Sequence, residues 1–244
     1  MDTTKIGPLT VRSLGPSGGD GPAILLCHGF GAPGDDLVGL AHAIDVGGDR
    51  GPGVRWFFPE APLALDWGGG RAWWPIDLAR RQQLQLRGQA DQLRTETPPG
   101  LAAAREALEG VLAALERDHG VRRSRLILGG FSQGAMLATE VALASEQPFA
   151  GLAILSGTLL CADRWAAAAA ARGASIHALV CHGRRDPLLR FADAELLRGL
   201  LEQAGAEVEW VPHGGQHEIP AVVLERLGAF ARRRFDAVAA PPIA

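Results

Sequence analysis

A serine stands in a sequence context that could make it a nucleophile. Gly130-Phe131-Ser132-Gln133-Gly134 follows the apolar run at 125–129 and precedes a helical stretch. A strand, a tight turn and a helix in this order expose a serine hydroxyl at the end of a sheet. Glycines at both ends of the pentapeptide keep side chains out of the turn. The pattern predicts nucleophilic chemistry at Ser132, the alternative being a glycine-rich turn that merely contains a serine.

A serine hydroxyl is a weak nucleophile near neutral pH and needs a histidine base that a carboxylate orients. Asp186 and His217 each come just past the carboxyl end of an expected strand, in the chain order serine, aspartate, histidine. We therefore predict a catalytic triad of Ser132, Asp186 and His217. Asp163 and Asp193 are weaker candidates for the acid, since both fit the starts of surface helices.

The triad partners have simpler interpretations that stay open. Asp186 could only begin a turn, His217 could only precede the last helix, and His213 is a rival base. The i, i+4 spacing of His213 and His217 would suit a metal pair on a helix. Gly214 and Gly215 disfavour a helix there, so we expect no metal.

Two backbone N–H groups are candidates for an oxyanion hole, which stabilises the charge that develops on a substrate carbonyl. Gln133, directly after the serine, would supply one, and Phe30, between Gly29 and Gly31, would supply the other. We expect His28 to be structural and hydrogen-bonded beneath this loop.

The same loop also satisfies the dinucleotide pattern G-x-G-x-x-G at residues 29–34, after an expected strand. Pro33-Gly34-Asp35-Asp36 instead predicts a turn with carboxylates, which places negative charge where a phosphate would bind. We therefore expect no nucleotide and no other cofactor.

Short apolar runs bounded by glycine or proline predict strands covered on both faces, at 23–29, 54–58, 126–130, 152–155, 176–181 and 207–211. Helical stretches alternate with them, at 36–44, 101–119, 133–145, 163–172, 191–204 and 219–235. This alternation predicts an α/β fold, a mostly parallel central sheet with helices on both faces.

The remaining segments are less regular. Residues 10–14 predict an antiparallel edge strand, and residues 64–75, rich in glycine and tryptophan, predict a loop with an aromatic wall. The Gln- and Arg-rich stretch 80–99 predicts a helix with a linker, or a flap beside the site. We expect a single domain over 1–236 and a flexible tail over 237–244.

Composition limits the class of partner. The 244 residues carry a net charge of −3 and 47% hydrophobic residues, which favours neither nucleic acid nor stable membrane association. The polar start is not typical of a secretory signal, and the three cysteines are expected to be reduced thiols in a cytoplasmic protein. The expected state is a monomer or homodimer.

The chain resembles the phospholipase/carboxylesterase family of α/β-hydrolases, which includes acyl-protein thioesterases and small bacterial carboxylesterases. The segments that carry the resemblance are Leu26–Gly31, Phe58–Pro62, Trp73–Asp77, Gly129–Ala135, Leu155–Gly157, His182–Asp186 and His217–Ile219. The resemblance implies the α/β-hydrolase fold, the triad and oxyanion donors named above, and an open cleft with little or no lid. Gln216 stands where the family usually has glycine, and the 80–99 stretch is longer than expected.

These features together predict a serine carboxylesterase acting on small-molecule esters with small to medium acyl groups. Apolar side chains are expected to line the acyl side, with ordinary packing as the alternative for the tryptophans: Phe30, Trp73, Trp74, Leu159 and Leu160. Thioesterase or lysophospholipase activity on the same site is the nearest alternative. An amide hydrolase and a non-catalytic binding protein of this fold are the others.

Overall fold

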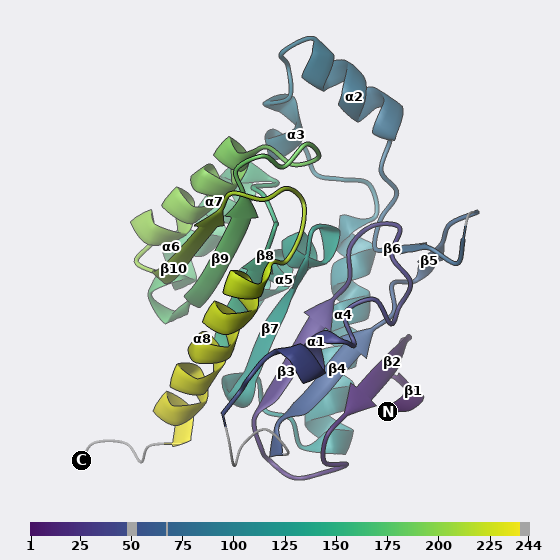
Figure 1. The fold of residues 1–244 in the computed structure, drawn as a ribbon, viewed down its shortest axis with the longest axis vertical. Helices are drawn as coiled ribbons and strands as arrows, with labels where there is room; N and C mark the ends of the chain where they lie inside the picture. Colours follow the sequence, from purple (N-terminus) through teal and green to yellow (C-terminus); the bar gives the residue numbers. More distant parts are fainter. Residues whose placement is uncertain (48–52, 67, 240–244) are drawn as a thin grey trace.

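One central sheet organises the chain, of which the computed structural model describes residues 1–47, 53–66 and 68–239. Over these residues the sheet has eight strands in the order β1-β2-β4-β3-β7-β8-β9-β10 (Figure 1). The strands are β1 Asp2–Ile6, β2 Leu9–Leu14, β3 Ala23–Cys27, β4 Arg55–Pro59, β7 Leu126–Phe131, β8 Gly151–Leu155, β9 His177–Gly183 and β10 Glu207–His213. Pairing is antiparallel for β1–β2 and β2–β4 and parallel from β4 to β10. The parallel strands therefore all end at one edge of the sheet.

Helices connect the strands and cover both faces of the sheet. They are α1 Leu40–Ala43, α2 Leu78–Leu86, α3 Gln92–Thr95, α4 Leu101–His119, α5 Gln133–Ala144, α6 Ala162–Arg172, α7 Phe191–Gln203 and α8 Ala221–Ala239. Two short 3-10 turns, Arg123–Arg125 and Gly173–Ser175, precede β7 and β9, and β5 Leu63–Ala64 pairs with β6 Arg71–Ala72 in a small hairpin.

Side chains alternate across the sheet and divide the core into two layers. Leu25, Leu128 and Ile154 belong to the layer that also holds the buried faces of α4, α5, α6 and α7. Ile24 and Ile127 point the other way, into the layer that contains Leu227 and other residues of α8. The predicted α/β architecture with helices on both faces is confirmed.

The six expected parallel strands are all present, and the differences lie at the periphery. Residues 10–14 fall in an antiparallel strand, but β1 lies outside it, so β2 is not the edge. In the stretch 36–44 only α1 is helical, and the residues before it form turns. Residues 237–239 of the expected tail belong to α8, and 240–244 lie outside the described residues.

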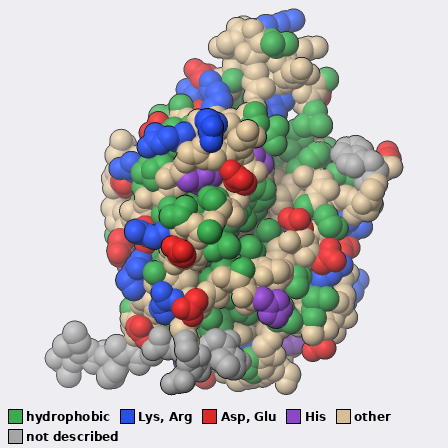
Figure 2. Space-filling view, in the orientation of Figure 1, with side chains coloured by type: hydrophobic (Ala, Val, Ile, Leu, Met, Phe, Trp, Pro, Cys, Tyr) green, Lys and Arg blue, Asp and Glu red, His purple; other side chains and the backbone are tan. Residues whose placement is uncertain are grey.

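The segment 77–99, here named the α2–α3 excursion, leaves the sheet at the edge where the parallel strands end. Figure 1 shows α2 standing beyond the body of the molecule, and Figure 2 shows the same segment as a projecting knob. Leu84 is the buried residue of α2, whereas Leu86 is 81% exposed. Ion pairs tie the excursion to the body, with Asp91 2.7 Å from Arg190 and Arg94 3.2 Å from Asp193. The expected helix is thus present, and the rest of the stretch packs beside the strand ends.

Among the described residues, no helix is both long enough and apolar enough to cross a membrane.

Candidate active site

The backbone at Ser132 is held in a strained conformation. Its φ of 54° and ψ of −116° are unusual for a residue with a side chain. The rest of the chain packs closely around the turn between β7 and α5, which leaves no room for side chains at its glycines. A Cβ on Gly134 would lie 2.0 Å from the carbonyl oxygen of Cys27, and one on Gly130 would lie 2.5 Å from the same atom. The Ser132 N–H donates to the Leu155 carbonyl at 2.8 Å, which ties the turn to β8.

Asp186 and His217 form a partly buried hydrogen-bonded pair. His217 Nδ1 lies 2.6 Å from Asp186 Oδ2, and the aspartate side chain is fully buried. The N–H groups of Leu188 and Leu189 donate to Oδ1 at 2.8 and 2.9 Å. Burial acts to raise the pKa of Asp186, but hydrogen bonds from His182, His217 and the Leu189 N–H outweigh it and hold the pKa well below its usual range. The carboxylate is therefore ionised when His217 donates to it through Nδ1.

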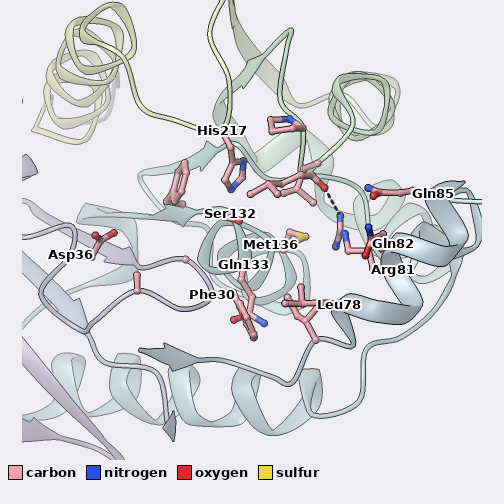
Figure 3. A pocket seen from close by; sticks show the side chains of 17 residues that line it. Phe30, Asp36, Leu78, Arg81, Gln82, Gln85, Ser132, Gln133, Met136 and His217 are labelled. Carbon is pink, nitrogen blue, oxygen red and sulfur yellow. Dashed lines mark hydrogen bonds between the residues drawn. The ribbon is translucent and has the colours of Figure 1, made fainter. Parts of the chain in front are cut away.

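The structure brings Ser132 and His217 together in one cleft of about 420 Å³ at the carboxyl edge of the sheet. Figure 3 shows the His217 imidazole pointing toward Ser132. The imidazole also packs on Phe131, with ring centroids 4.7 Å apart. Because Asp186 engages Nδ1, the Nε2 atom is the one left to face the serine. The rival base His213 is not part of this lining, and its Nδ1 accepts from the Gly215 N–H at 3.2 Å.

The expected oxyanion donors flank the serine. Phe30 and Gln133 both line the cleft, and Gln133 begins α5, so its N–H belongs to the first turn, where no preceding carbonyl of the helix can accept it. The Gln133 side chain is fully buried. Its Oε1 accepts from the Trp73 N–H at 2.9 Å and its Nε2 donates to the Trp74 carbonyl at 2.8 Å. The amide thus fixes the 73–74 segment behind the serine turn.

His28 supports the other side of the same loop. The Ala61 N–H donates to His28 Nε2 at 3.1 Å, so Nδ1 carries the proton that it donates to the Gly29 carbonyl at 2.8 Å. Burial lowers the pKa of His28, which keeps the ring neutral. The Trp73 indole N–H donates to the His28 carbonyl at 2.9 Å. The predicted hydrogen bonding of His28 beneath the loop is confirmed, and its structural role stays a prediction.

The residues predicted to line the acyl side are dispersed. Trp73 is 1% exposed and is absent from the lining of the cleft, as are Trp74, Leu159 and Leu160. Trp74 and Leu160 instead line a second cavity of about 620 Å³, and Leu159 lines a small pocket next to it. The cleft and the second cavity share Ile76, Arg81 and Met136, so they adjoin.

Sequence reasoning did not identify several residues of the site. Met136, one turn after the serine on α5, and Arg81, on α2, both line the cleft. Leu188 and Leu189 follow Asp186 and line the cleft as well. His182 is fully buried, and its Nε2 lies 3.2 Å from Asp186 Oδ2 and 2.9 Å from the Leu189 carbonyl. The four-residue spacing of His182 and Asp186 around a strand end was the available signal for this last contact.

Across the described ranges, no group of three or more His, Cys, Asp or Glu side chains is placed to hold a metal ion.

A mostly parallel sheet, helices on both faces and a strained serine between a central strand and its helix define an α/β-hydrolase. A family model described as Phospholipase/Carboxylesterase matches residues 16–233. The chain therefore belongs to the phospholipase/carboxylesterase family, and it is an enzyme of the class that hydrolyses carboxylic esters.

Individual relatives agree with this assignment. A Gibberella zeae protein named acyl-protein thioesterase 1 is 26% identical over 244 residues, which cover 96% of this chain and 98% of that protein. The crystal structure of esterase PE8 has a TM-score of 0.74 and 25% identity, covering 92% of this chain and 98% of the other. The Bacillus cereus carboxylesterase, at 17% identity and a TM-score of 0.69, covers 93% of this chain and 94% of its own and shows the shared fold.

Proposed function

We propose that this chain is a serine carboxylesterase that hydrolyses small to medium acyl esters through Ser132, His217 and Asp186. The observation that carries the proposal is the 2.6 Å pair of Asp186 and His217, whose imidazole faces a strained serine inside a cleft. A nucleophile, a base and a group that orients the base are the parts that acyl transfer requires.

The proposed reaction begins when Ser132 Oγ attacks the ester carbonyl carbon and His217 Nε2 takes the hydroxyl proton. The N–H groups of Phe30 and Gln133 stabilise the negative charge on the carbonyl oxygen. When the tetrahedral intermediate collapses, the C–O bond breaks, and His217 returns the proton to the departing alcohol. Asp186 keeps the imidazole oriented and stabilises its charged form.

Water then releases the acyl group from the serine. His217 removes a proton from the water as its oxygen attacks the acyl carbon, and the same proton passes to Ser132 Oγ as the acid leaves. Each turnover consumes one water molecule and leaves the enzyme unchanged.

The proposed acyl site has two parts. Phe30, Ile76, Leu78 and Met136 make the cleft partly apolar next to the serine. The second cavity, with Trp74 and Leu160, adjoins the cleft at Ile76 and Met136 and would receive the end of a medium-length chain. Trp73 instead donates hydrogen bonds to Gln133 Oε1 and to the His28 carbonyl. Its proposed role is therefore to support the loop that carries Phe30.

The test is hydrolysis of p-nitrophenyl esters from acetate to palmitate. Ser132→Ala should lower kcat by on the order of 10⁶-fold, as removal of the nucleophile does in another serine hydrolase. Ser175→Ala is the matched control. Ser175 lies before β9, at the amino end of the parallel strands, and its hydroxyl donates to the Arg172 carbonyl oxygen. A fluorophosphonate probe should label the wild type and the control but not Ser132→Ala. A Ser132→Ala enzyme that keeps a tenth of wild-type turnover would remove the serine from this role.

Thioesterase activity on the same site is the second candidate. The second cavity could hold a longer chain, and the Gibberella zeae relative is named an acyl-protein thioesterase. Competition between a p-nitrophenyl ester and an acyl thioester of the same chain length would rank the two substrates by kcat/KM. If a folded enzyme turns over neither, the proposed acyl substrates are wrong, and an amide of the same acyl group is the next substrate to test.

A further inference from the structure

Arg81 places a positive charge in the cleft. It extends from α2. Of the described residues that line the cleft, Arg81 is the one Lys or Arg and Asp36 is the one Asp or Glu. Figure 3 shows the two on opposite sides of Ser132. Arg81 also lines the second cavity and the small pocket beside it, so this residue borders all three spaces.

The guanidinium has unused hydrogen-bonding capacity. Its Nη2 donates to the Leu188 carbonyl at 3.1 Å, which fastens α2 to the loop after Asp186. The Nε–H and Nη1–H groups have no hydrogen-bond acceptor among the described residues, and neither nitrogen is a buried unsatisfied atom. They therefore keep solvent-accessible surface, and a planar guanidinium can donate two parallel hydrogen bonds to a carboxylate or phosphate.

The nearest carboxylates are already engaged with other partners. Asp193 pairs with Arg190 at 2.8 Å and with Arg94 at 3.2 Å, and Asp186 accepts from His217 and its own loop. No carboxylate of the described residues forms an ion pair with Arg81. Arg81 shares a small pocket with Arg94 and Arg190. Asp91 and Asp193 each pair with both of those arginines. Of the three, Arg81 is therefore the arginine without an ion-pair partner among the described residues.

Partial burial of a guanidinium without an ion-pair partner costs free energy, because the charge loses part of its hydration. Burial acts to lower the pKa of Arg81, opposed by the charges of Asp193 and Asp186 and reinforced by Arg190. A bound anion would restore the favourable interactions that the guanidinium loses with water.

We propose that Arg81 is a substrate-binding residue that recognises an anionic group, a carboxylate or phosphate, on the ester held at Ser132. The inference rests on the proposed esterase function and narrows its substrate class to esters that carry a negative charge away from the reacting carbonyl. Asp36, on the other side of the cleft, would disfavour the reversed orientation of such a substrate.

The test compares charged and neutral esters of matched shape. On the acyl side, the p-nitrophenyl monoester of adipic acid is compared with its methyl ester. On the alcohol side, 4-acetoxybenzoate is compared with methyl 4-acetoxybenzoate. The readout is the ratio of kcat/KM for the anionic and neutral members of each pair, so that changes in folding or in the triad affect both members and cancel.

We expect the wild type to favour the anionic member of one pair, and the pair that shows the preference identifies which side of the ester carries the charge. Arg81→Gln should lower that ratio at least tenfold, mainly through KM, Arg81→Glu should lower it further, and Arg81→Lys should restore part of it. Arg87→Gln is the matched control, because Arg87 is exposed at the end of the same helix and is absent from the cleft lining. Added salt should raise KM for the anionic ester of the preferred pair.

Two outcomes would overturn the inference: equal kcat/KM within both pairs, or a preference that Arg81→Gln and Arg81→Glu leave unchanged. In either case Arg81 only fastens α2 to the Leu188 carbonyl. Both outcomes are distinct from failure of the esterase proposal, because that failure would also abolish Ser132-dependent hydrolysis of the neutral esters.

Discussion

Replacing Gln133 by leucine tests whether the buried amide stabilises the protein through its hydrogen bonds to the 73–74 backbone. The substitution keeps a side chain of similar length but leaves the Trp73 N–H and the Trp74 carbonyl without their partner. Both tryptophans are almost completely buried, at 1% and 2% exposure, so water cannot replace the amide easily. At about 1–3 kcal/mol for each unsatisfied buried group, the loss of unfolding free energy should be about 2–6 kcal/mol.

That loss is large compared with the roughly 5–15 kcal/mol that stabilises a typical domain. The midpoint of thermal unfolding should fall by about 4–24 °C, at roughly 2–4 °C per kcal/mol for a chain of this size. Urea denaturation provides the free energy directly, with Gln83→Leu as control because Gln83 is exposed on α2.

Turnover should survive better than stability, because the proposed oxyanion donor at Gln133 is the backbone N–H. We expect kcat on p-nitrophenyl butyrate to fall less than 10³-fold at a temperature where Gln133→Leu is folded. A stability loss no larger than that of Gln83→Leu would refute the reasoning, since it would show that the two backbone groups find other partners.

Two further perturbations test the packing and the protonation of the site. Gly134→Ala should unfold the protein or displace α5, because the new Cβ would lie 2.0 Å from the Cys27 carbonyl oxygen. Gly199→Ala is the control: a Cβ there has no heavy atom within 4 Å, so the substitution should stabilise α7 by about 0.5–1 kcal/mol. Equal melting temperatures for Gly134→Ala and the wild type would contradict the first. Since burial lowers the pKa of His28 below its ordinary 6.5, the unfolded chain binds the proton more readily, and stability should decline as pH falls below about 6.5. Urea titrations at pH 7, 6 and 5 should show a smaller decline in His28→Gln, and parallel declines would exclude His28 as the cause.

The central sheet could be predicted because its strands are covered on both faces and so are apolar throughout. All five residues of β3 and of β8 are buried, and both lie within or next to the expected runs. β1 escaped prediction for the opposite reason, since four of its five residues are exposed and its sequence is polar. An edge strand of this kind is stabilised by pairing with β2 rather than by burial of its own side chains.

The positions of the proposed triad could be anticipated from chain order, because parallel strands end at one edge and bring the following loops together. The wall of the cleft could not. Arg81 reaches the site only because contacts distant in sequence, such as the pair of Asp91 with Arg190, hold the α2–α3 excursion against the body. The sequence predicted that Trp73 and Trp74 form an aromatic wall. Only the tertiary structure shows that the Gln133 side chain hydrogen-bonds the backbone of both behind the serine turn.

The separation between the sheet and the α2–α3 excursion has a consequence for how enzymes of this architecture diversify. Ser132, Asp186 and His217 depend on strand ends and on the loops that follow them, whereas the excursion supplies cleft residues such as Arg81 without contributing a strand to the sheet. Insertions, deletions and substitutions within 77–99 can therefore accumulate while the proposed triad is conserved. If Arg81 binds substrate as proposed, exchange of this one segment between homologues would transfer substrate preference, and the segment offers directed evolution a short, contiguous target.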